Sequence, residues 1–290
     1  MATEIQAERA ERSFSGYGGL QLHAESWQRD DARATVIICH GYAEHCRRYD
    51  HVCRFLYDKG FNVSTYDWRN HGRSPGMKGY VASMDSLVED LSLYVDDVIR
   101  KGSPDLPVFL LGHSTGGGTV ALYAIRKALP ERIRGLILSA PTVVIPVNPV
   151  LKTISGVISR VLPKMKTVDA APRSALSRDP EIEAMAEADP LFYKDKVMAR
   201  TGYEILRGCG LIQDGMARIT LPTMILYGTA DTIVDPAGGR LLYEGIGSRD
   251  KTIESYEGFY HEILNETGKE KVMTDMLTWL ERQLEEVGAG

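Results

Sequence analysis

The sequence predicts an α/β fold, with one mostly parallel sheet and helices on both of its faces. Short apolar runs rich in β-branched residues alternate with longer segments of helical periodicity, which is typical of strand–helix–strand units. Glycine, proline or aspartate flanks each apolar run, as expected for strands buried on both faces. With 290 residues, 43% of them apolar, the chain is long enough to bury a large core.

The strands follow from these runs in chain order. The segment RSFSGYGGLQLHAESWQ indicates a hairpin of two antiparallel strands around Gly18 and Gly19, which we expect at one edge of the sheet. Six further strands are expected at TVIIC (35–39), FNVSTYD (61–67), PVFLLG (107–112), GLILSA (135–140), TMILYG (223–228) and KTIESY (251–256). Helices are expected between them, over residues 51–59, 84–101, 115–129, about 236–246 and 269–286.

This rhythm stops once, after the sixth expected strand. Residues 141–201 show proline-rich punctuation and short helical pieces, so we expect a helical cap inserted into a core of residues 1–140 and 202–290. From Val147 to Leu162, apolar residues recur at steps of three and four, while Lys152 and Arg160 fall on other faces of the helix. Two interpretations remain open for this helix: a lid that packs on the core, or a basic amphipathic surface for lipid.

Composition excludes several classes of protein. The 34 basic and 39 acidic side chains leave a net charge of −5, which is unlike a nucleic-acid-binding protein. No apolar run approaches the ~18 to 20 residues of a membrane span, and the first residues do not resemble a signal peptide, so we expect a cytoplasmic location. The four cysteines have no metal-ligand spacing and are expected to be free thiols.

The strongest motif is GHSTG, residues 112–116, which fits the pattern G-x-S-x-G. It follows an expected strand and precedes an expected helix, which is the context of a nucleophile elbow. Small neighbours allow the serine a strained backbone that points its hydroxyl into a cleft. We therefore interpret Ser114 as a nucleophile, and the competing interpretation is an ordinary helix N-cap.

A serine hydroxyl needs a base to accept its proton and a carboxylate to orient that base. Asp231 follows the strand TMILYG, at the sheet edge where open α/β sheets carry their sites. Asp235 competes with it, but directly precedes Pro236 and suits the start of the next helix. His261 is the one histidine after Ser114, so the chain order is Ser, Asp, His. The alternative for His261 is a surface loop residue.

Acyl transfer also needs donors for the oxyanion of the tetrahedral intermediate. One is expected to be the amide of Thr115, which follows the nucleophile. The second is expected from the loop HGYAEH after TVIIC, where Gly41 opens the turn and Tyr42 offers its amide. His40 is interpreted as structural, with no role in proton transfer.

Several segments together resemble the monoacylglycerol lipases of the α/β-hydrolase fold, in the form typical of bacteria. They are HGYAEHCRRYD, DWRNHGRS, GHSTGGG, SAP, LSRDPE, ADPL, GTAD and GFYHE, and the resemblance extends from about Arg12 to Arg282. It implies the same triad and the same two oxyanion amides. It also implies that Glu44 and Arg48 lie near a pocket for the glycerol head group. No metal or organic cofactor is implied, and the cap becomes an apolar roof over the acyl chain that can rest on a membrane.

The expected reaction is therefore hydrolysis of a small lipid ester through an acyl-enzyme. A general carboxylesterase, a lysophospholipase and an acyltransferase remain open, because the cap residues that set the pocket are not located by sequence. A non-catalytic receptor is disfavoured because all three triad residues are present. An aminopeptidase is disfavoured because no acidic cluster stands out in the cap, and a dehalogenase because it uses a carboxylate where Ser114 stands.

Overall fold

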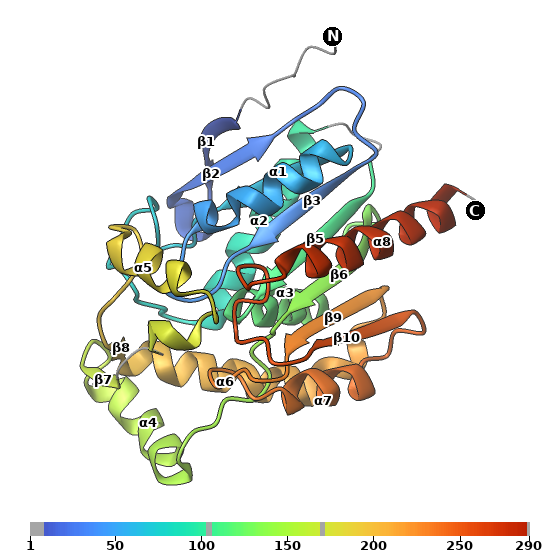
Figure 1. Cartoon of the computed structure of the whole chain (residues 1–290). Coiled ribbons are helices and arrows are strands. Elements are labelled where there is room, and N and C mark those ends of the chain that lie inside the picture. The colour runs from blue at the N-terminus through green and yellow to red at the C-terminus, as the bar shows by residue number, and fades with distance from the viewer. Residues whose placement is uncertain (1–8, 103–105, 169–171, 289–290) are drawn as a thin grey trace.

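A computed structural model describes residues 9–102, 106–168 and 172–288. These residues form one eight-stranded sheet in the order β1-β2-β4-β3-β5-β6-β9-β10, with helices on both faces (Figure 1). β1 and β2 pair antiparallel as a hairpin at one edge, β2 pairs antiparallel with β4, and the remaining pairs are parallel. The expected fold class and the edge hairpin are confirmed.

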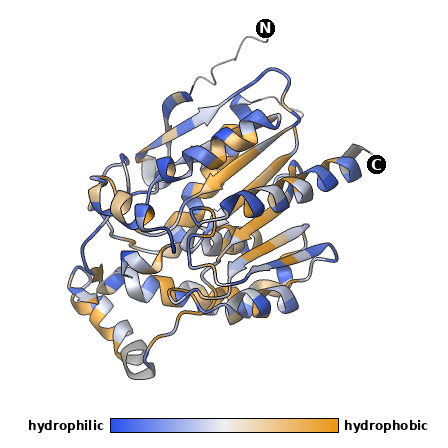
Figure 2. Cartoon of the chain, in the orientation of Figure 1, coloured by the Kyte–Doolittle hydropathy of each residue, from blue (hydrophilic) through white to orange (hydrophobic). Residues whose placement is uncertain are grey.

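The strands lie where the apolar runs predict them. Their bounds are β1 Arg9–Ser15, β2 Gln21–Trp27, β3 Ala34–Cys39, β4 Phe61–Tyr66, β5 Val108–His113, β6 Ile133–Ser139, β9 Thr223–Gly228 and β10 Lys251–Tyr256. All residues of β3, β4, β5 and β9 are buried, because helices cover both faces of a parallel sheet. Figure 2 shows these central strands as the hydrophobic interior of the molecule.

The sheet separates the hydrophobic core into two layers, each covered by helices. α1 (Asp50–Asp58) and α8 (Lys269–Gly288) pack on one face, and α2 (Met84–Lys101), α3 (Thr115–Arg126) and α7 (Ala237–Gly245) pack on the other. Alternate residues of one strand enter different layers: Val36 and Ile38 join the α1/α8 side, whereas Ile37 and Cys39 join the α2/α3 side. The helix over residues 84–101 has the expected bounds, and the helix from Thr115 ends three residues earlier than expected, at Arg126.

The segment after β6 lies over one end of the sheet (Figure 1). It contains α4 (Pro149–Val161), β7 (Lys166–Val168), η3 (Arg173–Ala175), α5 (Pro180–Ala188) and β8 (Val197–Met198), and leads into α6 (Ala199–Gly215). The short ribbon of β7 and β8 is not among the expected elements, since strands of three and two residues are too short to leave a sequence pattern. The expected cap boundary at residue 201 falls inside α6, and the division into core and cap stays a prediction.

α4 confirms a helix in the apolar stretch from Val147 to Leu162. The side chains of residues 149–153, Lys152 among them, lie outside the described part. Of the described side chains, Val157 is 62% and Val161 70% exposed. Within the part of the chain that the structure describes, no helix combines the length and the apolar composition of a membrane span.

Candidate active site

Ser114 occupies the sharp turn between β5 and α3. Its backbone has φ 54° and ψ −124°, a strained conformation for a residue with a side chain. The turn requires glycine at Gly116, where a Cβ atom would lie 2.2 Å from the carbonyl oxygen of Cys39. The Ser114 side chain makes no capping hydrogen bond to α3, which contradicts the N-cap interpretation. The hydroxyl is therefore free to face another loop.

His261 faces Ser114 from the loop after β10. Its Nε2 atom lies 2.8 Å from Ser114 Oγ, and its Nδ1 atom lies 2.7 Å from Asp231 Oδ2. Because a carboxylate only accepts, Nδ1 carries the proton, and the neutral ring presents Nε2 as an acceptor to the serine hydroxyl. Burial lowers the pKa of His261, but the charge and hydrogen bond of Asp231, with the charges of Glu262 and Glu44, outweigh it and raise the pKa above 6.5.

The loop after β9 holds Asp231 in place. Its Oδ1 atom accepts the amides of Ile233 and Val234, at 2.8 and 3.0 Å, so Oδ2 is directed at the histidine. Asp235, the competing aspartate, accepts the amide of Ala237 at the start of α7, at 2.9 Å. The structure thus brings Ser114, His261 and Asp231 together and leaves Asp235 at a helix start.

The loop after β3, residues 40–49, is called the Gly41 loop here. His40 Nε2 accepts the amide of Trp68 at 3.0 Å, so its Nδ1 carries the proton and donates to the Gly41 carbonyl at 2.7 Å. Burial, followed by the charge of His71, lowers the pKa of His40 to about 3, which keeps the ring neutral. The Gly41 amide donates to Glu44 Oε1 at 2.7 Å. Both backbone polar groups of Gly41, the residue before Tyr42, are therefore held by side chains of the same loop.

Glu44 and Arg48, expected near a head-group pocket, are not among the residues that line the cavity over Ser114. Glu44 Oε1 also accepts the hydroxyl of Tyr49, at 3.0 Å. Arg48 donates to Glu262 Oε2 at 2.5 Å and lies under the ring of Phe192. Both side chains are buried against protein groups, and their expected place near a head-group pocket stays a prediction. Burial, then repulsion from Glu262, raises the pKa of Glu44 to about 7.

A cavity of about 520 Å³ opens over the serine. Ser114, His261, Tyr42 and Thr115 lie in its wall. The amide of Thr115 belongs to the first turn of α3, where helix amides have no partner within the helix. The rest of the described wall is mainly apolar and comes largely from the segment after β6, including Ile145, Val147, Ile158, Leu176, Phe192, Val197, Ile205 and Leu206. The sequence does not identify these cavity residues individually, since the segment has no period that shows which side chains point inward.

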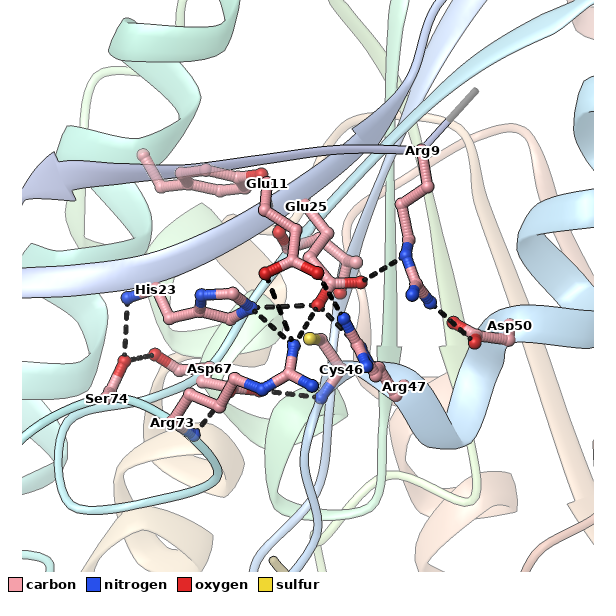
Figure 3. Close-up of polar contacts among 12 residues, drawn as sticks. Arg9, Glu11, His23, Glu25, Cys46, Arg47, Asp50, Asp67, Arg73 and Ser74 are labelled. Atoms are coloured by element: carbon pink, nitrogen blue, oxygen red, sulfur yellow. Dashed lines mark hydrogen bonds and ion pairs between the residues drawn. The ribbon is translucent and has the colours of Figure 1, made fainter. Parts of the chain in front are cut away.

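A second polar cluster lies away from the cavity. His23, Glu25 and Cys46 bring a nitrogen, an oxygen and a sulfur atom within 4.8 Å of one another. However, Glu25 Oε1 is already in hydrogen-bond contact with His23, Arg47 and Arg73, at 2.8, 2.8 and 2.9 Å (Figure 3). Burial raises the pKa of the Cys46 thiol well above 9. A protonated thiol and two adjacent guanidinium groups do not suit a cation.

This cluster instead anchors the Gly41 loop to the sheet. Asp67 Oδ1 accepts the amide of Cys46 at 2.8 Å, and its Oδ2 accepts the amide of Arg73 at 2.7 Å (Figure 3). Burial raises the pKa of Glu25, but hydrogen bonds from His23 and Arg47 and the nearby arginine charges outweigh it and hold the pKa at about 2. The buried carboxylate thus stays ionised and binds Arg47 of the loop.

A strained serine between strand and helix, with a histidine and an aspartate at two further strand ends, defines an α/β-hydrolase. The model of the family described as serine aminopeptidase, S33, matches residues 30–268. The chain is 34% identical over 279 residues to the monoacylglycerol lipase of Mycolicibacterium smegmatis, covering 95% of this chain and 98% of that protein. It therefore belongs to the serine aminopeptidase S33 family and to the monoacylglycerol lipases.

Two further comparisons agree. The monoglyceride lipase of Mus musculus is 32% identical over 280 residues, covering 94% of this chain and 90% of that protein. The crystal structure of the Paleococcus ferrophilus monoacylglycerol lipase superposes with a TM-score of 0.80 at 30% identity, covering 90% of this chain and 99% of that chain.

Proposed function

We propose that this chain hydrolyses monoacylglycerols to a fatty acid and glycerol, with Ser114 as nucleophile, His261 as base and Asp231 as the residue that orients it. One observation carries the proposal: a serine, histidine and aspartate linked by 2.8 and 2.7 Å contacts open into an apolar cavity. The names of the relatives support this substrate class.

In the proposed reaction, His261 accepts the Ser114 proton as the oxygen attacks the ester carbonyl. The amides of Tyr42 and Thr115 bind the oxyanion, and His261 then donates its proton to the departing glycerol oxygen. Water, deprotonated by the same ring, attacks the acyl-serine ester and releases the fatty acid. The side chain of Asp231 keeps the imidazole in the required tautomer and stabilises its charged form.

The cavity favours a lipid ester over a peptide. Its volume of about 520 Å³ lies within the range of single small-ligand sites, and its wall is rich in aliphatic side chains. An aminopeptidase needs a carboxylate to receive the substrate amine, and among the described wall residues there is none. Arg173, a charged residue at the wall, already pairs with Glu187. We therefore propose ester hydrolysis in spite of the family's description.

The test is a rate comparison. Monoacylglycerols of increasing chain length are compared with p-nitrophenyl and aryl esters of the same acyl chains, using the wild type and Ser114→Ala. We expect higher kcat/KM for the monoacylglycerols and no turnover of any ester by the variant. Fast turnover of the aryl esters with poor turnover of monoacylglycerols would identify a general carboxylesterase instead.

We propose further that residues 141–201 form a cap and that α4 lies on a lipid surface when substrate enters. The support is an apolar face open to solvent: Ile154 is 46%, Val157 62% and Val161 70% exposed. Exposed apolar faces of this kind mark interaction surfaces. Arg160 and Lys164 are exposed nearby and suit anionic lipid.

A further inference from the structure

One segment of the cap contacts both loops on which the proposed reaction depends. We call residues 176–193 the cap bridge; it consists of α5 and the turns on either side of it. One end contacts the loop of residues 257–268, called the His261 loop, and the other contacts the Gly41 loop. These two loops carry the base and one of the two oxyanion amides, and they follow different strands of the sheet, β10 and β3.

The first end of the cap bridge binds the His261 loop through backbone and charge. The amide of Glu262 donates to the carbonyl of Leu176 at 2.7 Å. The amide and Nε atom of Arg178 each donate to the carboxylate of Glu266 at 3.0 Å, and this buried carboxylate also accepts the amide of Tyr260 at 2.8 Å. Glu262, which follows His261, is thus held directly by the cap bridge. Tyr260, which precedes His261, is held through the carboxylate of Glu266 that Arg178 also binds.

The other end binds the Gly41 loop at a strained point. Ala43 has φ +73°, a conformation that is unfavourable for a residue with a side chain and persists only where its surroundings impose it. The amide of Tyr193 donates to the carbonyl of Ala43 at 2.8 Å, and His45 Nε2 donates to Asp189 Oδ2 at 2.7 Å. The cap bridge therefore holds the residues that follow Tyr42, whose amide is the proposed oxyanion donor.

Packing joins the two ends. Phe192 of the cap bridge lies over the guanidinium group of Arg48, 5.0 Å from ring centroid to Cζ, and Arg48 donates to Glu262 of the His261 loop. Phe192 also belongs to a small buried cluster with Ala43, Leu176 and Ala186. The cluster contains residues of the Gly41 loop and of both ends of the cap bridge, so a displacement at one end is transmitted to the other.

We propose that the cap bridge is a fixed part of the catalytic machinery, which sets the position of the Tyr42 amide relative to His261, with Asp189 as its positioning residue on the Gly41 loop. This inference rests on the roles given to Tyr42 and His261 in the proposed function. Asp189 suits this role because its Oδ1 atom accepts the amide of Leu191 at 2.8 Å, which leaves Oδ2 directed at His45.

The experiment compares three variants on p-nitrophenyl butyrate, a soluble ester that needs no lipid surface. Loss of one oxyanion donor costs about 100 to 1,000-fold in rate, and a displaced donor retains part of this, so Asp189→Ala should lower kcat about 10 to 100-fold with KM nearly unchanged. Asp189→Asn keeps an acceptor for His45 and should restore kcat to within about threefold. Asp195→Ala, which removes an exposed cap carboxylate paired with Lys166, should behave as wild type.

A second measurement separates positioning from general damage. A trifluoromethyl ketone forms a tetrahedral adduct with the serine and places an anionic oxygen between the oxyanion amides, whereas an alkyl glyceryl ether, which has no carbonyl oxygen, does not. Asp189→Ala should weaken binding of the ketone by the same factor as kcat/KM and leave binding of the ether unchanged. Equal weakening of both ligands would overturn the proposal.

The opposite end provides a variant in case Asp189→Ala does not fold. Arg178→Gln removes the guanidinium that binds Glu266 and should also lower kcat. Combined with Asp189→Ala, its effect should be smaller than the product of the two single effects, because either change alone frees the bridge. A folded Asp189→Ala or Arg178→Gln enzyme with wild-type kcat, or strictly multiplicative effects, would overturn the proposal. If the wild type cleaves the soluble ester but no monoacylglycerol, the substrate assignment fails and the bridge remains testable.

Discussion

The Nε2 atom of His261 lies 2.8 Å from the Oγ atom of Ser114, although 147 positions separate the two residues in the chain. The serine stands after β5 and the histidine after β10, and the parallel arrangement brings the carboxyl ends of both strands to one edge of the sheet. The hydroxyl therefore has an acceptor for its proton before any substrate binds.

Replacing Ser114 should abolish hydrolysis. Ser114→Ala leaves the ester carbonyl without a nucleophile, and losses of about 10⁴ to 10⁶-fold in kcat are typical of triad serines. Fatty-acid release is measured on purified protein, with Tm as the check on folding. Ser13→Ala, an exposed serine on β1, is the matched control and should keep full activity. Substantial turnover by Ser114→Ala would contradict the assignment of the nucleophile.

Replacing Asp231 should lower kcat far more than replacing Asp235, the other aspartate of the loop after β9. Asp231→Asn removes the carboxylate that fixes the His261 tautomer, and the expected loss is about 10⁴-fold in kcat. Asp235→Asn keeps an oxygen for the Ala237 amide and should retain nearly all activity. Steady-state kinetics of both variants on one ester make the comparison. A larger loss for Asp235→Asn would reverse the assignment.

Activity should fall in acid with a midpoint above pH 6.5. Because the pKa of His261 is raised, the ring stays protonated up to a higher pH than a free histidine does. A protonated ring cannot accept the proton of Ser114. Glu262→Gln removes one of the negative charges that raise this pKa, so the acid limb of kcat/KM should move to lower pH. Glu257→Gln, an exposed residue of the same loop, should leave the limb in place. A rate that is flat from pH 5 to 8 would exclude His261 as the base.

The exposed face of α4 should contribute to lipid binding. Val157→Ser with Val161→Ser removes two exposed apolar side chains, each worth about 1.5 kcal/mol or more when buried in lipid. Vesicle co-sedimentation should therefore weaken by at least about tenfold, while turnover of a soluble ester stays unchanged. Leu93→Ser, on the 38% exposed leucine of α2, is the control. Unchanged co-sedimentation of the double variant would leave α4 with a packing role alone.

Much of the fold was predictable because its signals are local. A strand buried on both faces needs a continuous apolar run, so β3, β5, β6 and β9 are visible in the sequence. The motif around Ser114 is equally local, since a strained turn admits few side chains at its glycine positions. Chain order then indicated Asp231 and His261, which the structure brings together.

The parts that the sequence did not identify depend on contacts between distant segments. The partners of Arg48, Glu262 and Phe192, come from segments far along the chain, so its buried ion pair and ring contact were not apparent. The ribbon of β7 and β8 and the wall of the cavity were not apparent for the same reason. A short element without periodicity is stabilised by what it packs against, and the sequence does not identify that neighbour.

By itself, then, the sequence determined the α/β architecture, the order of the strands along the chain and the residue types of the triad, because each is encoded in periodicity or in a tight turn. Only the tertiary structure decided the spatial order of the strands, the facing of His261 and Ser114, the burial of Arg48 and the attachment of the cap bridge to both loops. These features arise where loops from separate strands meet at one sheet edge. Their hydrogen bonds and ion pairs depend on distances in space that no local pattern specifies.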